Sequence, residues 1–301
     1  MSSSTVIPAA RTSAAAGVRQ VATDYFELTK PKVQTLLLFT TVTTMEIAGS
    51  PSIEKIALTC LGGYLSAGGA GAVNHYFDRD IDAQMKRTAS RPIPSGRVAP
   101  RAALIYGLGL AALSFVLMSL TLNVLAASLA LTGFVGYVGV YTLWLKRRTP
   151  QNIVIGGAAG AIPPLVGWAA ATGNLTVAAV LLFAIVFFWT PPHFWALALL
   201  IKDAYAAAKV PMLPVVRGDR ETARQIVLYT FVLVAATLAP VAFGVFGLGY
   251  GVAALLLGAL FLWLAVALQR DLSRARASRL FHYSLLYLAL LFAAAAIDVV
   301  I

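Results

Sequence analysis

The chain has 301 residues, of which 59% are apolar and 12% are charged, and its mean hydropathy is +0.82. Soluble domains are about 45–50% apolar and about 25% charged, so this composition excludes a soluble enzyme and a disordered chain. The net charge of +11 would suit nucleic acid only on a solvated basic face, and because most of the chain is too apolar for such a face, no nucleic-acid partner is expected.

The first 30 residues are rich in Ser, Ala and Thr and lack the apolar centre of a signal peptide. We therefore predict a mobile cytoplasmic tail over residues 1–30 and a single transmembrane domain over residues 31–301.

Nine apolar runs follow, each about long enough to cross a hydrocarbon core, which takes roughly 20 residues. They are 33–49, 55–77, 102–120, 124–144, 152–172, 175–201, 223–243, 246–269 and 280–301. The sequence therefore predicts an all-α integral membrane protein with nine transmembrane helices.

The basic residues orient these helices. Threading the chain through nine spans places 22 of its 23 Lys and Arg residues on one side and Lys55 alone on the other. Since the positive side faces the cytoplasm, we predict a cytoplasmic N-terminus and a functional site on the cytoplasmic side, where most of the acidic residues also lie. The surplus of positive charge would also attract anionic lipid of the bilayer.

The second run ends in an acidic motif. Asn74, Asp78 and Asp82 are spaced four residues apart, so on a continuing helix they share one face. Two carboxylates at a helix C-terminus repel each other and the macrodipole, and a bridging Mg²⁺ with oxygen ligands would offset that cost. The alternative is a solvated acidic helix end that pairs with neighbouring arginines.

Basic residues flank this motif on the same side of the membrane. They are Lys146, Arg147 and Arg148 after the fourth run, and Lys86, Arg87 and Arg91 after the acidic motif. Together with Mg²⁺ they are what an organic diphosphate requires, although topology alone also requires positive charges. Asp80 points away from the shared face and is expected to pair with Arg79 or Lys86.

Prolines interrupt two of the later runs. Pro191 and Pro192 lack N–H donors and are expected to kink the sixth helix, and the fifth carries Pro163 and Pro164. Irregular backbone at membrane depth is tolerated where it lines a cavity.

Three histidines fall in the cytoplasmic half of the predicted bundle: His75, His193 and His282. Each is either a hydrogen-bonded helix contact or a functional group, and neutral imidazole is a usual ligand of haem iron.

Several segments together resemble the UbiA superfamily of intramembrane aromatic prenyltransferases over about residues 24–301. These are the acidic motif with Arg91-Pro92-Ile93-Pro94-Ser95-Gly96, then Tyr141-x₄-Lys146-Arg147-x-Thr149-Pro150. Thr149-Pro150-Gln151-Asn152-Ile153-Val154-Ile155-Gly156-Gly157, Pro191-Pro192-His193-Phe194-Trp195 and Val210-Pro211-Met212-Leu213-Pro214 resemble its haem-farnesylating branch.

The resemblance implies a UbiA-like fold, with the nine helices surrounding a central cavity. It also implies that farnesyl diphosphate, bound with Mg²⁺, gives its farnesyl group to a vinyl group of haem B, and that water completes the product, haem O. Haem B would be a substrate rather than a cofactor. The enzyme would lie in the cell inner membrane and deliver its product to haem A synthase or a terminal oxidase.

The same resemblance assigns roles to individual residues. It implies that Asn74, Asp78 and Asp82 hold Mg²⁺ and diphosphate, with Tyr141 beside them. Substrate-binding residues are expected among Lys146, Arg147, Arg87, Arg91, Asn152, His193, Lys202 and Tyr205.

The second carboxylate motif departs from the family pattern. Relatives place an Asp directly before the tyrosine where this chain has Ala204, so either Asp203 joins the metal ligands or it pairs with Lys202.

Two other functions remain open. One is prenylation of a different aromatic or tetrapyrrole acceptor, such as a quinone precursor or chlorophyllide. The other is membrane transport, because transporters also use broken helices and charges at membrane depth.

Overall fold

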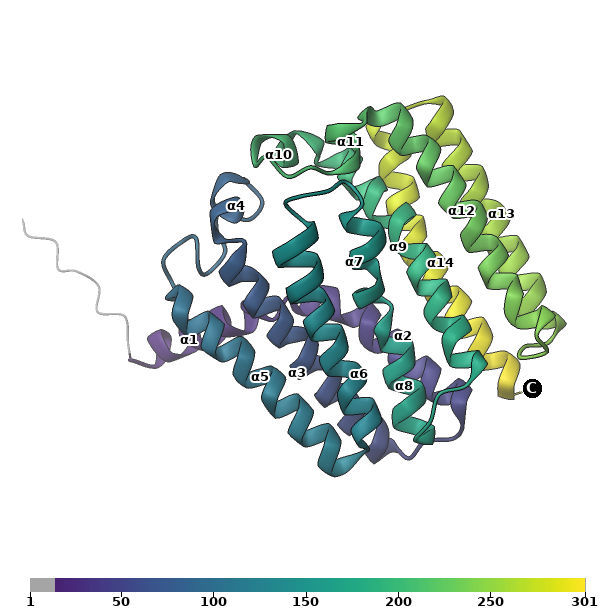
Figure 1. The fold of residues 1–301 in the computed structure, drawn as a ribbon, viewed down its shortest axis with the longest axis horizontal. Helices are drawn as coiled ribbons and strands as arrows, with labels where there is room; N and C mark the ends of the chain where they lie inside the picture. The colour runs from purple at the N-terminus through teal and green to yellow at the C-terminus, as the bar shows by residue number, and fades with distance from the viewer. Residues whose placement is uncertain (1–13, 301) are drawn as a thin grey trace, which may run out of the picture.

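The computed structural model describes residues 14–300, and every regular element in that range is a helix (Figure 1). The elements are α1 (Ala14–Leu28), α2 (Pro31–Ala48), α3 (Ile53–Phe77), α4 (Arg79–Gln84), α5 (Pro100–Thr121), α6 (Val124–Val135), the π-helix η1 (Gly136–Leu145), α7 (Asn152–Gly160), α8 (Ile162–Thr172), α9 (Val177–Leu200), α10 (Lys202–Ala207), α11 (Leu213–Val216), α12 (Gly218–Ala242), α13 (Leu248–Arg270) and α14 (Arg274–Val300).

Eight helical stretches in the described range are long and apolar enough to cross a membrane, and they coincide with eight of the predicted runs. The prediction of an all-α membrane protein is thus confirmed. The first predicted run is helix α2, whose five threonines, Lys32 and Glu46 keep it outside the eight stretches that are apolar enough. A count of nine spans stays a prediction.

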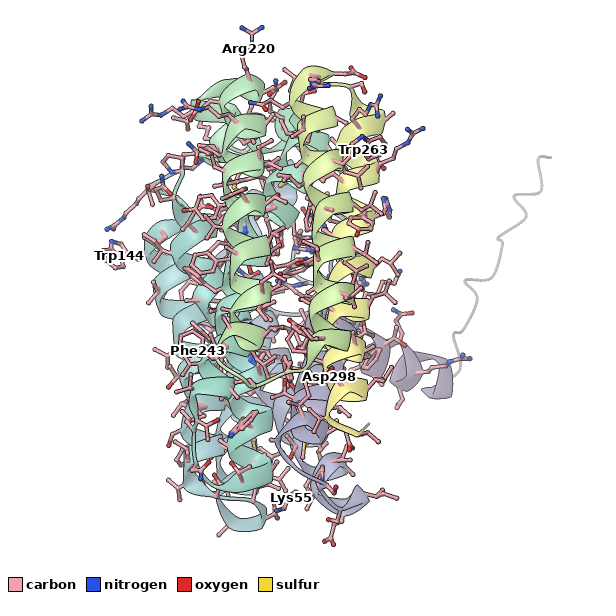
Figure 2. All side chains as sticks on the ribbon, turned by 90° about the vertical axis from the view of Figure 1, so that its right-hand side faces the viewer. Lys55, Trp144, Arg220, Phe243, Trp263 and Asp298 are labelled. Carbon is pink, nitrogen blue, oxygen red and sulfur yellow. The ribbon has the colours of Figure 1, made fainter. Side chains whose placement is uncertain are left out.

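The two ends of the bundle differ in charge and structure. Short helices α4, α10 and α11 gather at one end of the molecule (Figure 1). Arg220 lies at one end and Lys55 at the other (Figure 2), as the distribution of basic residues predicts. Which end faces the cytoplasm stays a prediction.

Helix α1 occupies part of the region where we predicted a mobile tail. Asp24 and Leu28 are buried, at 3% and 0% exposure, and Arg97 donates to Asp24 at 2.8 Å and to Glu27 at 3.0 Å. The prediction missed α1 because its anchor, Arg97, lies more than 70 positions away along the chain. The rest of the predicted tail, residues 1–13, lies outside the described residues.

Helices α3 and α5 pack closely because glycines meet at their crossing. A Cβ on Gly69 would lie 2.5 Å from the carbonyl oxygen of Gly107, and one on Gly107 would lie 2.8 Å from that of Gly69. Small residues at such a crossing let the two backbones approach, which is the usual basis of helix packing in membranes. This contact fixes α3, the helix that carries the acidic motif.

The proline pairs act differently from each other. The fifth run breaks at Ala161 into α7 and α8, with Pro163 and Pro164 in the first turn of α8, where proline costs no helical hydrogen bond. Helix α9, by contrast, is continuous through Pro191 and Pro192 to Leu200, and the kink expected there stays a prediction.

Candidate active site

The acidic motif lies where α3 meets α4. Asn74 is in the last turn of α3, Asp78 caps that helix, and the Asp82 N–H bonds the Asp78 carbonyl at 2.8 Å. The three side chains are only 2%, 1% and 4% exposed. The structure thus places the motif inside the protein rather than in solvent, while the pairing with neighbouring basic residues that the alternative expected is present.

Asp78 is at the centre of this cluster. Its Oδ2 accepts from the Asn74 amide at 2.7 Å and pairs with Lys146, while Arg147 lies 3.8 Å from Oδ1. Oδ1 is enclosed and has no hydrogen-bond partner among the described residues. A buried carboxylate oxygen without a partner is costly unless a ligand completes it.

Asp82 is held by the loop that follows it. The Arg91 guanidinium contacts both carboxylate oxygens of Asp82 at 2.8 Å. This contact joins the first half of the signature to its second half.

Lys30, in the link between α1 and α2, completes the cluster, and the sequence reasoning missed it. Its Nζ donates to Asn74 Oδ1 at 2.5 Å and to the Tyr137 hydroxyl at 3.4 Å. Burial, and next the charge of Arg91, lower the pKa of Lys30 to about 7. The sequence analysis used Lys30 only as one of the basic residues that orient the helices. Its place directly before Pro31 was the available sequence signal, and the structure shows Lys30 in a left-handed conformation (φ 54°).

The π-helix η1 brings further polar groups to the cluster. The Lys146 N–H bonds the Tyr141 carbonyl, five residues back, and the Thr142 hydroxyl bonds the Tyr137 carbonyl at 2.9 Å. Thr142 also accepts from the Asn74 amide at 3.0 Å. Rare π-helical turns are frequent at functional sites, and here the wider turn presents Tyr137, Tyr141 and Lys146 together.

Gly156 makes room for Tyr141. A Cβ on Gly156 would lie 2.5 Å from Cδ2 of the Tyr141 ring, and that ring stacks on Tyr137 with centroids 5.5 Å apart. Tyr137 and Thr142 were not among the predicted site residues, because the π-helical register brings Thr142 to Asn74 and Tyr137 to Lys30.

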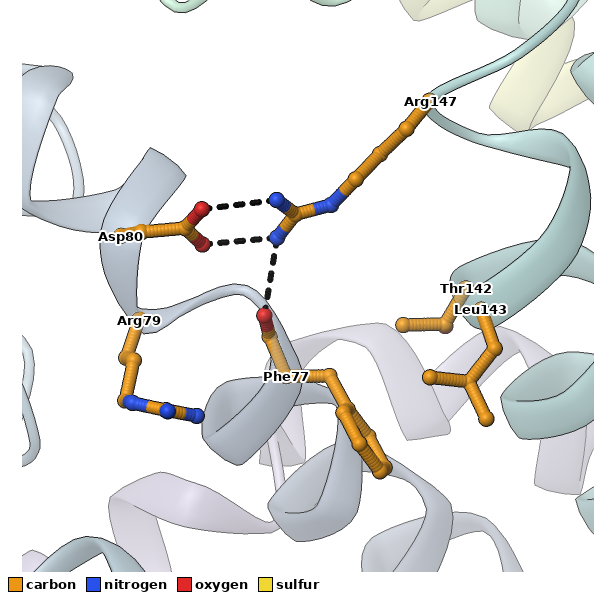
Figure 3. A pocket seen from close by; sticks show the side chains of 6 residues that line it. All are labelled: Phe77, Arg79, Asp80, Thr142, Leu143 and Arg147. Carbon is orange, nitrogen blue, oxygen red and sulfur yellow. Dashed lines mark hydrogen bonds and ion pairs between the residues drawn. The ribbon is translucent and has the colours of Figure 1, made fainter.

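Asp80 pairs with Arg147, and not with Arg79 or Lys86 as predicted. Two hydrogen bonds of 2.7 and 2.6 Å join the groups, and Arg147 also donates to the Phe77 carbonyl at 2.8 Å (Figure 3). These hydrogen bonds lower the pKa of Asp80 to about 2. Arg79 turns instead to the Tyr76 carbonyl at 2.6 Å.

A cavity of about 420 Å³ opens beside this pair. Its lining residues are Phe77, Arg79, Asp80, Thr142, Leu143 and Arg147, the set drawn in Figure 3. Since Thr142 also bonds Asn74, the cavity borders the acidic cluster.

The second motif stands apart from the first. Asp203 is exposed on α10 and makes no ion pair or hydrogen bond within residues 14–300. Lys202 pairs with Asp219 at 2.9 Å, not with Asp203. Among the described residues no three His, Cys, Asp or Glu side chains form a common metal-ligand group, so Asp203 does not join Asp78 and Asp82 in such a group.

The remaining predicted substrate-binding residues fall in two groups. Tyr205 is half-buried on α10 and Arg87 is exposed; burial raises the pKa of Tyr205, and the positive charges of Lys146 and Arg87 oppose that rise. Asn152 is fully buried, and its Oδ1 has no partner among the described residues. His193 lies on α9 and contacts α14 instead.

The donor set fits a magnesium ion. Mg²⁺ takes oxygen ligands, usually one or two carboxylates together with substrate phosphates, and the partnerless Oδ1 of Asp78 supplies such an oxygen beside the Asn74 amide. Lys146 and Arg91 neutralise the carboxylates of Asp78 and Asp82 in this structure.

The fold and the site define a class: a helical membrane protein with a buried carboxylate–amide–lysine cluster suited to an anionic ligand. The model of the UbiA prenyltransferase family matches residues 36–292. The chain therefore belongs to the UbiA prenyltransferase family.

Two curated relatives are similar over most of the chain. A protoheme IX farnesyltransferase from Roseiflexus sp. is 54% identical over 280 residues, 92% of this chain and 52% of the relative. One from Synechococcus sp. is 54% identical over 281 residues, 93% of this chain and 85% of the relative. The chain thus spans about half the length of the Roseiflexus relative.

Solved structures share the fold at low sequence identity. A digeranylgeranylglyceryl phosphate synthase has a TM-score of 0.78 at 19% identity, covering 93% of this chain and 99% of the other. A UbiA homologue from Archaeoglobus fulgidus bound to DMAPP and Mg²⁺ has a TM-score of 0.65 at 16% identity, covering 91% and 99%.

Proposed function

We propose that this protein transfers the farnesyl group of farnesyl diphosphate to a vinyl group of haem B, giving haem O and diphosphate. The identity to relatives named protoheme IX farnesyltransferase supports this acceptor and donor. The Thr149–Gly157, Pro191–Trp195 and Val210–Pro214 segments support the same branch.

The observation that carries the chemistry is the buried cluster around Asp78. Breaking the bond between C1 of farnesyl and its diphosphate moves negative charge onto the leaving group. Fixed positive groups in a water-poor site stabilise that charge strongly. Lys30 and Lys146 already contact Asn74 and Asp78, so they are positioned to meet the diphosphate.

In this proposal Asn74, Asp78 and Asp82 hold Mg²⁺, and the ion supplies charge neutralisation to the departing diphosphate. The Archaeoglobus homologue bound to DMAPP and Mg²⁺ supports this metal for the family. Since Asp203 is exposed and unpaired in the described residues, we leave it out of the ligand set.

The acceptor is held at the apolar side of the site. The terminal vinyl carbon bonds farnesyl C1, the positive charge passes to the neighbouring vinyl carbon, and water adds there with loss of a proton. Tyr137 and Tyr141 of η1 help to exclude bulk water from the farnesyl cation until that step. The stacked rings of the two tyrosines are suited to attract the cation.

The remaining parts of the proposal concern location. We place the enzyme in the cell inner membrane with Asp78 toward the cytoplasm, on the strength of the basic residues at that end. Its product would pass to haem A synthase or to a terminal oxidase.

The test is an acceptor competition with the purified full chain in lipid nanodiscs. Farnesyl diphosphate is supplied with Mg²⁺ and equal amounts of haem B, chlorophyllide and a quinone precursor, and products are separated by chromatography and mass spectrometry. We expect haem O as the main prenylated product. Prenylation of another acceptor with no haem O would overturn the acceptor, and no diphosphate release with any acceptor would overturn prenyl transfer.

A further inference from the structure

His193 on α9 is held in place by one hydrogen bond and by stacked rings on both of its faces. Its Nδ1 lies 2.7 Å from the Ser284 hydroxyl on α14. Its ring is stacked between Trp189, with centroids 4.3 Å apart at 16°, and Phe281, at 4.8 Å and 23°. Two parallel rings and one hydrogen bond leave the imidazole a single orientation.

The hydrogen bonds of Ser284 also fix which nitrogen of His193 carries the proton. The Ser284 hydroxyl donates its only hydrogen to the Phe281 carbonyl at 2.6 Å. It must therefore accept from His193, so Nδ1 is the protonated nitrogen and Nε2 keeps its lone pair. Trp189 Nε1 donates to the Ser284 carbonyl at 2.7 Å and holds this arrangement from the other side.

The lone pair of His193 Nε2 accepts no hydrogen bond from the described residues. Nε2 makes no hydrogen bond within residues 14–300, yet it is not among the fully enclosed polar atoms. His193 as a whole is 6% exposed. An imidazole whose Nδ1–H is bonded to an oxygen and whose Nε2 is free has the arrangement of a metal-ligating histidine.

The other two histidines lack this arrangement. Both nitrogens of His75 are enclosed and have no hydrogen-bond partner in the part of the chain that the structure describes. His282 is exposed, and its Nδ1 lies 2.8 Å from the Ser278 carbonyl of its own helix. Of the three, His193 alone combines a fixed proton with an accessible lone pair.

Helix α7 connects His193 to the acidic cluster. A Cβ on Gly157 would lie 2.8 Å from Thr190 of α9, and the neighbouring Gly156 packs as closely on Tyr141. His193 is therefore one helix away from the diphosphate cluster.

We propose that His193 Nε2 is the axial ligand of the iron in the tetrapyrrole acceptor, and that Ser284 is the positioning residue that presents this lone pair. The proposal rests on the proposed function, because it takes an iron tetrapyrrole to be the acceptor. It adds how that acceptor is held and which end of the site holds it.

The experiment compares spectra of haem B bound to the full chain in nanodiscs. In His193→Asn the side-chain amide still donates toward Ser284, while the Nε2 ligand is removed. We expect the wild type to show the absorption and EPR signature of imidazole-ligated iron and His193→Asn to lose it. Metal-free protoporphyrin should bind both proteins equally, and the control His282→Asn should match the wild type.

Ser284 gives a second, independent readout. Ser284→Ala leaves the Nδ1–H without an acceptor, and we expect haem affinity to fall about 10–100-fold with metal-free protoporphyrin unaffected. Ser284→Thr should restore it. An unchanged imidazole signature in His193→Asn would overturn the proposal.

The outcomes distinguish a failure of the proposed His193 ligand from a failure of the proposed haem O synthesis. If the wild type forms haem O but binds haem B without an imidazole ligand, the role of His193 is wrong and the function stands. If the wild type neither binds haem B nor forms haem O, both are wrong.

Discussion

Helices α3 and α13 are similar in length but are built for different surroundings. In the most apolar stretch of α3 half of the residues are buried, against 28% in α13. The buried face of α3 is made of glycine, alanine and polar residues that end at Asn74 and His75. That of α13 also contains alanine and glycine, but its only polar side chain is Tyr250, and the others are apolar, such as Phe261 and Leu268.

The difference shows how the two helices contribute to the protein. Helix α13 exposes Leu256 and Trp263 at 66% and 61%, as a helix against lipid does, and its buried residues only pack. Helix α3 brings polar groups inside the bundle, where each unsatisfied one is costly, and the cost is reasonable if a ligand completes them. The predictions below test this division.

The largest effect should come from Asp78. Asp78→Asn removes the charge at the centre of the buried cluster, and we expect farnesyl transfer to fall about 10³-fold, because electrostatic groups at a developing charge contribute this much. Asp203→Asn, an exposed acid on α10, is the matched control and should stay near wild type. Equal losses in both variants would show that the second motif also holds the metal.

Next in size is Lys146. Lys146→Met keeps the length of the side chain but removes the cation that contacts Asp78, and we expect about a 10²-fold loss in kcat/KM for farnesyl diphosphate. Arg148→Met removes a charge two residues away that is exposed and unpaired among the described residues. If both variants lose activity alike, the basic cluster acts through overall charge rather than through contact.

A structural effect is expected at the crossing of α3 and α5. Gly107→Leu inserts a side chain where even a Cβ would lie 2.8 Å from backbone, and overpacking of this kind costs about 1–3 kcal/mol. Thermal unfolding of the detergent-solubilised protein should show a lower Tm. Gly109, with nothing within 4 Å of its Cβ position, gives the control Gly109→Leu, and equal Tm values would contradict the packing described here.

The smallest effect is expected at Asp80. Its pair with Arg147 is more than half exposed on the Asp80 side, and such pairs contribute under about 1 kcal/mol. Because the pKa of Asp80 is lowered to about 2, its stabilisation is complete above about pH 4 and lost only as the pH falls toward 2. Asp80→Asn should therefore change Tm little, and equally, between pH 5 and pH 8; a large or pH-dependent change in that range would mean that the pair is structural.

How much of this could be predicted from sequence depends on the range of the interaction. The helical spans and the shared face of Asn74, Asp78 and Asp82 follow from local periodicity, and the resemblance supplied Lys146 and Arg91 as their neighbours. The contact of Lys30 with Asn74 does not follow from either, because it joins residues 44 positions apart.

Two other features of the site also differ from the prediction because they depend on the three-dimensional structure rather than on local spacing. The partner of Asp80 is Arg147, 67 positions away, whereas local spacing favoured Arg79 or Lys86. Tyr137 and Thr142 reach the cluster only because residues Gly136–Leu145 form a π-helix, and the sequence was interpreted with an ordinary α-helical repeat.

The most direct test of the central claim is a Mg²⁺ titration of diphosphate release. The purified wild type and Asp78→Asn are given farnesyl diphosphate and haem B over a range of Mg²⁺ concentrations after chelation. We predict that release by the wild type is lost without Mg²⁺ and returns in a saturable way, while Asp78→Asn needs far more Mg²⁺ and never reaches the wild-type rate. Equal Mg²⁺ dependence in the two proteins would contradict the claim that this buried carboxylate holds the metal for the leaving diphosphate.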